Sequence, residues 1–93
     1  MRLEAGMVVK HFKRETVTDK NSSQYLYLIL GFAEHTETKE KLVIYQALYG
    51  EGEIYARPYD MFMGKVDKEK YPNIKQEYRL DEASEEEWKQ YYG

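Results

Sequence analysis

The chain has 93 residues, which fits one small domain, and 42% of them are hydrophobic while 33% are charged. Fourteen Lys and Arg against seventeen Asp and Glu give a net charge of −3, too mild to indicate a nucleic-acid partner by charge alone. Cysteine is absent, which excludes disulfides, thiolate metal sites and thiol catalysis. Aromatic residues are in excess, because ten Tyr, three Phe and one Trp make up 15% of the chain.

The N-terminal residues lack the apolar stretch of a secretory signal, and an acidic residue, Glu4, comes early. The longest run that leans apolar covers residues 25–33, whereas a membrane-spanning helix needs about 20 apolar residues. We therefore expect a cytoplasmic protein with no membrane partner.

The first half of the chain reads as strands. Residues 7–12 predict a first strand, and residues 13–24 predict a polar loop. A long strand is expected over residues 25–34 and its return over residues 42–49, with a polar turn at residues 36–40 between them. The long strand places Leu26, Leu28, Leu30 and Phe32 on one face and Tyr25, Tyr27 and Ile29 on the other. Because both strands are apolar on both faces, they are expected to be central in the sheet.

The second half continues the pattern. Gly50-Glu51-Gly52 predicts a short hairpin connection, because glycine supplies the positive φ that such turns need. Residues 53–57 predict a fourth strand, which ends at Pro58 because proline cannot donate to an interior ladder. Residues 59–63 predict one helical turn that inserts Met61 and Phe62 into the core. Residues 74–80 predict a closing strand.

The last thirteen residues, 81–93, are acidic and predict a short helix. Ser84 and Glu87 have the spacing of a capping box, and Trp88, Tyr91 and Tyr92 share one helical face. We expect this face to cover the domain of residues 1–80 or a partner subunit, so a homodimer is one alternative. The fold class predicted is mainly β, a small five-stranded, partly open SH3-like barrel with one helical turn and a short C-terminal α-helix.

Several segments resemble the bacterial family called domain of unknown function 1653. The resemblance rests on Gly6-Met7, the His11-Phe12-Lys13 element, the turn from His35 to Thr38, the Ala47-Leu48-Tyr49-Gly50 run and Arg57-Pro58 followed by Met61-Phe62. These come in the family's order and cover about residues 6–80. The family usually has a shorter turn where this chain has residues 14–24, and many members carry Trp in place of Tyr55. The resemblance implies a compact bacterial domain and implies no activity.

The candidate binding residues are mostly tyrosine and one arginine. Arg57 precedes Pro58, which holds its backbone extended, and it alternates onto the same face as Tyr55. An arginine among tyrosines can bind a carboxylate or phosphate, or stack on a base. The tyrosines that could form such a surface are Tyr25, Tyr27, Tyr45, Tyr49, Tyr55 and Tyr59. The alternatives are that the tyrosines only fill a face of the barrel, and that Arg57 pairs with a local acid such as Glu37.

The only two histidines, His11 and His35, form with Glu37 a possible two-histidine, one-carboxylate metal site, and Lys13 lies beside His11 in the sequence. The alternative is that both histidines make structural hydrogen bonds. No metal or cofactor is predicted, because the spacing of these residues does not support a metal site. Catalytic motifs are also missing: there is no nucleophile elbow and no phosphate-binding glycine loop.

Three functions remain open at this point. The first is a non-catalytic binding module that uses a Tyr/Arg surface for a peptide or protein partner. The second is single-stranded nucleic-acid (RNA) binding by the same face together with Lys13 and Arg14. The third is a small-molecule or metal-dependent enzyme around His11, His35, Glu37 and Arg57. The candidate ligand-binding residues are His11, Lys13, His35, Glu37, Tyr45, Tyr49, Tyr55 and Arg57.

Overall fold

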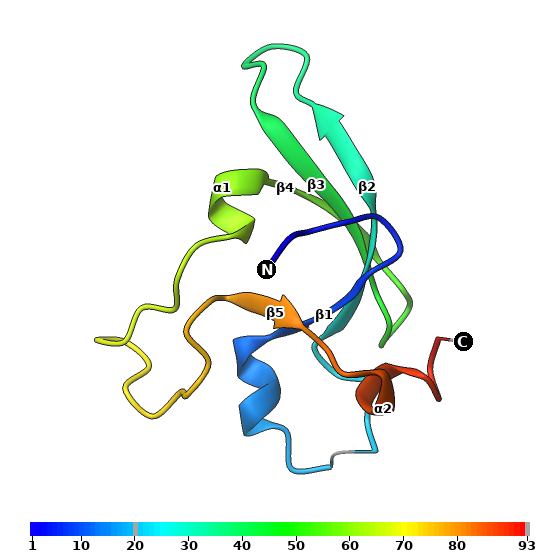
Figure 1. Cartoon of the computed structure of the whole chain (residues 1–93), viewed down its shortest axis with the longest axis vertical. Helices are drawn as coiled ribbons and strands as arrows, with labels where there is room; N and C mark the ends of the chain where they lie inside the picture. Colours follow the sequence, from blue (N-terminus) through cyan, green and yellow to red (C-terminus); the bar gives the residue numbers. More distant parts are fainter. Residues whose placement is uncertain (20, 93) are drawn as a thin grey trace.

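Five antiparallel strands form one sheet in the computed structural model, which describes residues 1–19 and 21–92 (Figure 1). The strands are β1 (Val8–His11), β2 (Leu26–Glu34), β3 (Lys41–Ala47), β4 (Ile54–Pro58) and β5 (Leu80–Glu82). Their order across the sheet is β4-β3-β2-β1-β5, so β4 and β5 form the two edges. The prediction of a mainly β fold is confirmed, and the sheet that does not close is consistent with a small, partly open barrel.

Among the residues that the structure describes, three short helical segments connect or follow the strands. A 3-10 helix, η1 (Phe12–Thr16), begins the stretch that was predicted as a loop. A single turn, α1 (Tyr59–Phe62), follows β4, and α2 (Glu85–Trp88) follows β5. Across the described ranges, none of the helices has the length and apolar character needed to cross a bilayer.

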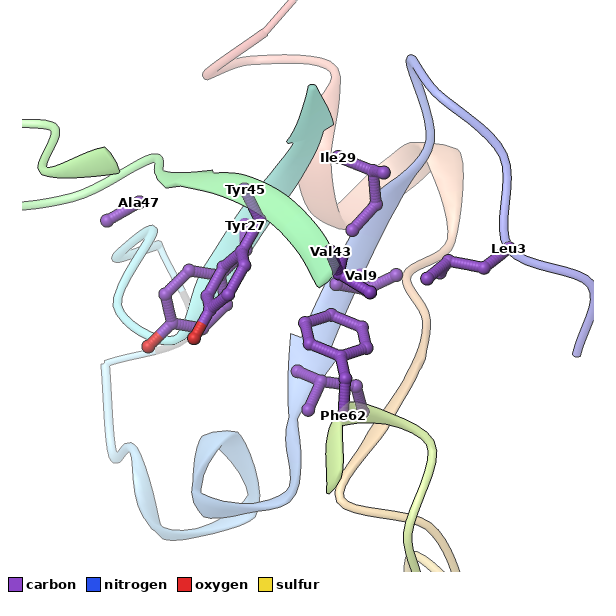
Figure 2. Packing of buried hydrophobic residues seen from close by; sticks show 9 residues of the cluster. Leu3, Val9, Tyr27, Ile29, Val43, Tyr45, Ala47 and Phe62 are labelled. Atoms are coloured by element: carbon purple, nitrogen blue, oxygen red, sulfur yellow. The ribbon is translucent and has the colours of Figure 1, made fainter. Parts of the chain in front are cut away.

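The sheet carries a separate hydrophobic cluster on each face. On the inner face, which Figure 2 shows, Phe62 of α1 lies against Val9 and Val43, and the three side chains are fully buried. On the outer face, Val8, Leu26, Leu28 and Ala83 form a second cluster, and Trp88 and Tyr91 pack against it. This arrangement explains why β2 is apolar on both faces, and β2 is the central strand of the five, as predicted.

A β-bulge at Leu30 changes the face on which the end of β2 presents its side chains. Ile29 pairs with Tyr45, and Gly31 pairs with Ile44, so Leu30 is an extra residue on its strand. Phe32 consequently lies opposite Val43 on the inner face, and Leu30 is 40% exposed. The prediction that Phe32 shares the face of Leu28 and Leu30 is therefore wrong for Phe32, because one inserted residue reverses the side-chain order of the residues that follow it.

Two further expectations are corrected by the structure. Phe62 is fully buried as predicted, but Met61 is 51% exposed, because a single helical turn directs only one of two consecutive side chains inward. Residues 74–79 do not form the closing strand. The closing strand is β5 (Leu80–Glu82), which pairs with β1. In the residues before it, Tyr78 forms an isolated antiparallel bridge with Lys65.

The C-terminal segment is attached to the sheet by charge as well as by packing. The backbone N–H and the hydroxyl of Ser84 both donate to Glu87 Oε1, each at 3.1 Å, at the start of α2. Glu87 also forms ion pairs with Lys10 Nζ at 3.5 Å and with Arg14 Nε at 3.4 Å. Arg14 is buried and donates from Nη1 to the carbonyl oxygens of Ser22 and Gln24. One carboxylate of α2 therefore holds β1 and the segment after it together.

Candidate functional site

A cavity of about 230 Å³ lies at the inner face, and every strand of the sheet contributes to its lining. We call this cavity the Tyr/Arg pocket. Its lining residues are His11 of β1, Tyr27 of β2, Tyr45 of β3, Tyr55 and Arg57 of β4, and Leu80 of β5. Four of the eight residues proposed from the sequence, His11, Tyr45, Tyr55 and Arg57, therefore meet in one place.

Tyrosine rings make the wall of the pocket. Tyr45 lies between Tyr27 and Tyr55, with ring centroids 5.4 Å and 5.6 Å away, because Tyr45 and Tyr55 face each other on paired strands. In Figure 2 the hydroxyl ends of Tyr27 and Tyr45 point away from Phe62. Burial raises the pKa of both Tyr27 and Tyr45 above the usual value of tyrosine. Both phenols therefore stay protonated at neutral pH, and the hydroxyl of Tyr45 can donate a hydrogen bond to a ligand.

Tyr49 packs against Tyr27 of this wall. Its hydroxyl lies 2.6 Å from that of Tyr27, and its ring also contacts Tyr25, with centroids 5.9 Å apart. Tyr25 in turn lies 5.7 Å from the ring of His11 and has a positive φ of 68°, which is uncommon for a residue other than glycine. Tyr49 thus orients pocket residues without lining the pocket itself.

His11 is neutral in this environment. Burial, together with the weaker effect of the positive charges of Lys13, Arg57 and Arg79, lowers the pKa of His11 from 6.5 to about 4. Its Nδ1 accepts a hydrogen bond from the backbone N–H of Lys13 at 3.1 Å. The proton of the neutral ring therefore lies on Nε2, which is the nitrogen left to donate to a ligand.

Arg57 brings a permanent positive charge to the pocket. It lies opposite Val43 near the end of the edge strand β4, and Pro58 follows it. Its side chain is half-buried, and within residues 1–19 and 21–92 no carboxylate forms an ion pair with it. The alternative in which Arg57 pairs with Glu37 is therefore not what the structure has. The pocket lining includes no acidic side chain at all among the described residues.

The structure places the remaining sequence candidates outside the pocket. His35 lies in the turn between β2 and β3, where its Nδ1 accepts the backbone N–H groups of Glu37 at 3.1 Å and Thr38 at 3.2 Å. This is the structural role given as the alternative for the histidines, and Glu37 is part of the same turn. Lys13 lies in η1, two residues after His11, and its Nζ is 5.9 Å from the centroid of the Tyr71 ring.

The hypothesis of a two-histidine metal site finds no geometric support. In the part of the chain that the structure describes, no group of three His, Cys, Asp or Glu side chains is placed to hold a metal ion. Tyr59, another of the candidate tyrosines, is also elsewhere: Lys41 Nζ lies 4.3 Å from its ring centroid and 4.7 Å from that of Phe32. The lining of the Tyr/Arg pocket is therefore mainly polar and aromatic and holds no cluster of metal ligands among the described residues.

A larger depression of about 570 Å³ lies near the C-terminal segment. Two of its three basic lining residues, Lys10 and Arg14, are already paired with Glu87. Glu15 accepts the backbone N–H groups of the third, Lys75, and of Gln76. These hydrogen bonds hold the pKa of Glu15 below its usual value, and the bond from the Lys75 backbone has the largest effect. These groups are used in holding the fold together, so this depression is a weaker candidate.

The family model for proteins of unknown function, DUF1653, matches residues 7–80. The chain belongs to this family. The match includes all six residues of the Tyr/Arg pocket and ends at Leu80. No curated protein and no solved structure gives a significant match. Membership of DUF1653 therefore identifies the domain without adding a ligand or an activity.

One pocket residue was missed by reasoning from the sequence. Leu80 was assigned to the end of a closing strand, but nothing suggested that it would face His11, its partner in the pairing of β1 with β5. The signal that could have found it was the apolar Leu80 standing alone between the polar residues Arg79 and Asp81. An isolated buried leucine of this kind marks the inward position of a short edge strand.

Proposed function

We propose that this protein is a non-catalytic binding module that takes an anionic group of a peptide or protein partner into the Tyr/Arg pocket. The observation that carries the proposal is the guanidinium of Arg57, which stands without an ion-pair partner among the described residues in a pocket lined by no acid. A half-buried charge gains most from a partner of opposite sign, because desolvation has already weakened its interaction with water.

The other polar groups of the pocket suit the same ligand. Neutral His11 offers its Nε2–H, and the phenols of Tyr45 and Tyr55 offer O–H donors. Hydrogen-bond donors grouped around the guanidinium of Arg57 complement a carboxylate, which only accepts hydrogen bonds. The tyrosine rings add apolar area, so that a ligand with a short hydrocarbon part gains from burial as well.

The same features favour binding over catalysis. The described lining has no serine, threonine, aspartate or glutamate that His11 could activate. Nδ1 of His11 is already engaged by the Lys13 backbone, and the pKa of about 4 makes the ring a weak base at neutral pH. The residues named for an enzymatic site, His35 and Glu37, lie in a different turn.

Single-stranded RNA is the second candidate, and it is favoured by the three cations near His11, which are Lys13, Arg57 and Arg79. Exposed Tyr55 offers a ring on which a base could stack. The two candidates differ in their response to salt. Phosphate-backbone binding weakens steeply as salt rises, whereas capture of a single carboxylate in a half-buried pocket changes little.

The test is to probe a random peptide array and a ten-nucleotide uridine oligomer with the labelled full chain at 50 and 200 mM salt. We expect a subset of peptides to bind at both concentrations. Arg57→Gln and Tyr55→Ala should each weaken binding about tenfold or more, since each removes a central contact of the pocket.

Arg2→Gln is the matched control, because it makes the same change of charge at a side chain that is 91% exposed and outside the pocket. Unchanged peptide capture by both pocket variants contradicts the proposal. Binding of the uridine oligomer that disappears at the higher salt concentration, without peptide capture, assigns the pocket to nucleic acid instead.

A further inference from the structure

The strand that carries Tyr55 and Arg57 is an open edge of the sheet. β4 pairs with β3 on one side, and none of the other strands in the described chain pairs with its opposite side (Figure 1). An edge strand presents unpaired N–H and C=O groups, which form a template for another strand. β5, the other edge, has only three residues.

The direction of the free groups on β4 follows from its pairing with β3. The N–H of Ala47 donates to the carbonyl oxygen of Glu53 at 2.9 Å, so the backbone groups of residue 53 face β3. The register from Ile54 to Pro58 is regular, so residues 55 and 57 face β3 as well. The N–H and C=O groups of Ile54 and Ala56 therefore face outward, and both residues are exposed.

Pro58 limits how far this edge can be used. Proline has no N–H group, so outward donors are present only at Ile54 and Ala56. The outward N–H and C=O groups of Ile54 and Ala56 give the edge two donors and two acceptors. Arg57 and Pro58 then complete β4, and α1 begins at Tyr59. A segment of about five residues uses all of these donors and acceptors, and a longer strand finds no further donor on β4 before the chain turns into α1.

The strand β4 has its free backbone edge and two pocket side chains next to each other. Tyr55 and Arg57 alternate with Ile54 and Ala56, so they lie on the inner face while the outward backbone groups come from the residues between them. In an added antiparallel strand, the residue opposite Arg57 forms a pair without hydrogen bonds, with Cα atoms about 4.5 Å apart and side chains close together. A side chain at that position is directed to the Tyr/Arg pocket.

We infer that the partner binds as a short extended strand, antiparallel to β4, with an aspartate or glutamate opposite Arg57 in the Tyr/Arg pocket. This inference rests on the proposed function and adds how the partner is held. Charge complementarity names the occupant: the pocket supplies a guanidinium and donor groups, and no carboxylate among its described lining residues. Affinity then comes from the backbone of Ile54 and Ala56, and selectivity comes from Arg57, as in other cases of strand addition.

The test uses isotope-labelled full chain and a mixture of capped pentapeptides of the form X-Asp-X-X-X, where X is any residue except cysteine and proline. With Asp opposite Arg57, the third and fifth peptide residues face Ala56 and Ile54. We expect the amide protons of Ile54 and Ala56 to move downfield and to exchange with solvent at least tenfold more slowly. The signals of Arg57 and His11 should shift together with them.

Two altered peptide mixtures separate the backbone from the charge. Methylation of the amide nitrogens at the third and fifth positions removes the two hydrogen bonds that these nitrogens donate to β4, and it should weaken binding about tenfold. Replacement of Asp by Asn should weaken binding to a similar degree. Equal binding of the methylated mixture overturns strand addition, whereas equal binding of the Asn mixture overturns the role of the carboxylate.

A reversal of charge provides a test on the protein itself. The Arg57→Glu variant should no longer bind the X-Asp-X-X-X mixture and should bind the corresponding X-Lys-X-X-X mixture instead. Loss of folding cannot produce this gain of binding. Ala56→Pro removes one outward donor without touching the ladder to β3, and it should weaken the wild-type interaction. Failure of the charge reversal to change the preferred mixture overturns the assignment of Arg57.

The outcomes also separate this inference from the proposed function. Shifts at His11 and Arg57 without protection of Ile54 and Ala56 overturn strand addition and leave the pocket as a binding site. No response at any of these residues, together with an empty peptide array, overturns both. Protection of Ile54 and Ala56 without peptide, growing with protein concentration, shows that a second copy of the chain occupies the edge, and this result overturns the inference.

Discussion

His11 is the residue whose protonation links stability to the pocket. Its pKa in the folded chain is about 4, lowered from 6.5 chiefly by burial, so between these values the unfolded chain binds a proton that the folded chain does not. Stability should therefore fall as the pH is lowered from 6.5 to 4. His11→Gln should reduce this slope in urea-unfolding experiments at pH 7, 5.5 and 4.5, and an unchanged slope contradicts the buried neutral state.

A bound carboxylate should act on the same residue in the opposite direction. A negative charge beside the imidazole favours the protonated ring and raises its pKa toward the usual range. Titration of His11 by NMR with and without the acidic peptide mixture measures this directly. A pKa of His11 that does not move on peptide binding would place the ligand away from the pocket.

Glu87 is a partly exposed acid that holds several segments of the fold together. Burial raises its pKa, but the Ser84 N–H bond and the charge of Lys10 outweigh this effect, so the net pKa is below 4.5. A carboxyl group whose pKa is lower in the folded chain stabilises it fully at higher pH, and this stability is lost as the pH falls below 4.5. The loss of stability linked to Glu87 thus begins at a lower pH than the loss linked to His11.

Glu87→Gln should lower the free energy of unfolding by about 1–2 kcal/mol at pH 7, because the buried Arg14 loses its charged partner. Glu86→Gln is the matched control, since this neighbour is exposed and makes neither ion pair. Chemical denaturation of both variants at pH 7 and pH 3.5 provides the measurement. A Gln variant of Glu87 that matches the control at both pH values would refute this role.

At the scale of elements, α1 is a short insertion that depends on one side chain. Phe62 is fully buried against the inner face and lies 5.1 Å from the ring of Tyr45, whereas its neighbour Met61 is 51% exposed. Phe62→Ala should cost about 3–5 kcal/mol, the usual range for a buried phenylalanine. Met61→Ala should stay within about 0.5 kcal/mol, the range of ordinary surface changes.

Thermal and urea unfolding of the two variants, followed by circular dichroism, compares them under identical conditions. Because the ring of Phe62 contacts Tyr45, the loss of Phe62 should also weaken peptide binding in molecules that remain folded. Comparable destabilisation by both substitutions would mean that α1 packs differently from the arrangement described above.

The strand pattern shows what could be predicted from the sequence at this scale. The extents of β1, β3 and the hairpin with Gly50 and Gly52 followed from alternation and turn chemistry. The bulge at Leu30 could not, because Leu30 is as apolar as its neighbours and only the pairing with Ile44 and Tyr45 reveals the extra residue. β5 was misplaced because three residues are too short for a periodic signal.

For the molecule as a whole, the antiparallel sheet and the alternation of tyrosines predicted half of the pocket. Tyr45, Tyr55 and Arg57 lie on adjacent strands and share a face, so their meeting follows from hairpin geometry. His11 joins them through the pairing of β1 with β2. Leu80 joins them only because β5 returns to pair with β1 across about 70 residues, and no local pattern records that closure. His35 was grouped with His11 by residue type, and chain topology separates them.

The two faces of the sheet divide the work of the molecule. The outer face is covered by Trp88 and Tyr91 of the C-terminal segment, while the inner face carries α1 and the Tyr/Arg pocket. Changes to the outer cluster should therefore alter stability more than ligand recognition, and changes at Tyr55 and Arg57 of the pocket should do the reverse. The site can be tested by substitution at His11, Tyr55 and Arg57, which belong to neither cluster, whereas Tyr27, Tyr45 and Leu80 are part of the inner cluster.

The buried side chain of Arg14 has a practical consequence for following this molecule in solution. Trypsin must draw an arginine into its specificity pocket before it cleaves the following bond, and a guanidinium bound to Ser22, Gln24 and Glu87 is not free to enter. Cleavage after Arg14 then requires the C-terminal segment to detach first. The rate of that single cut, read from the mass of the fragments, reports how often the chain opens at its end while the sheet remains folded.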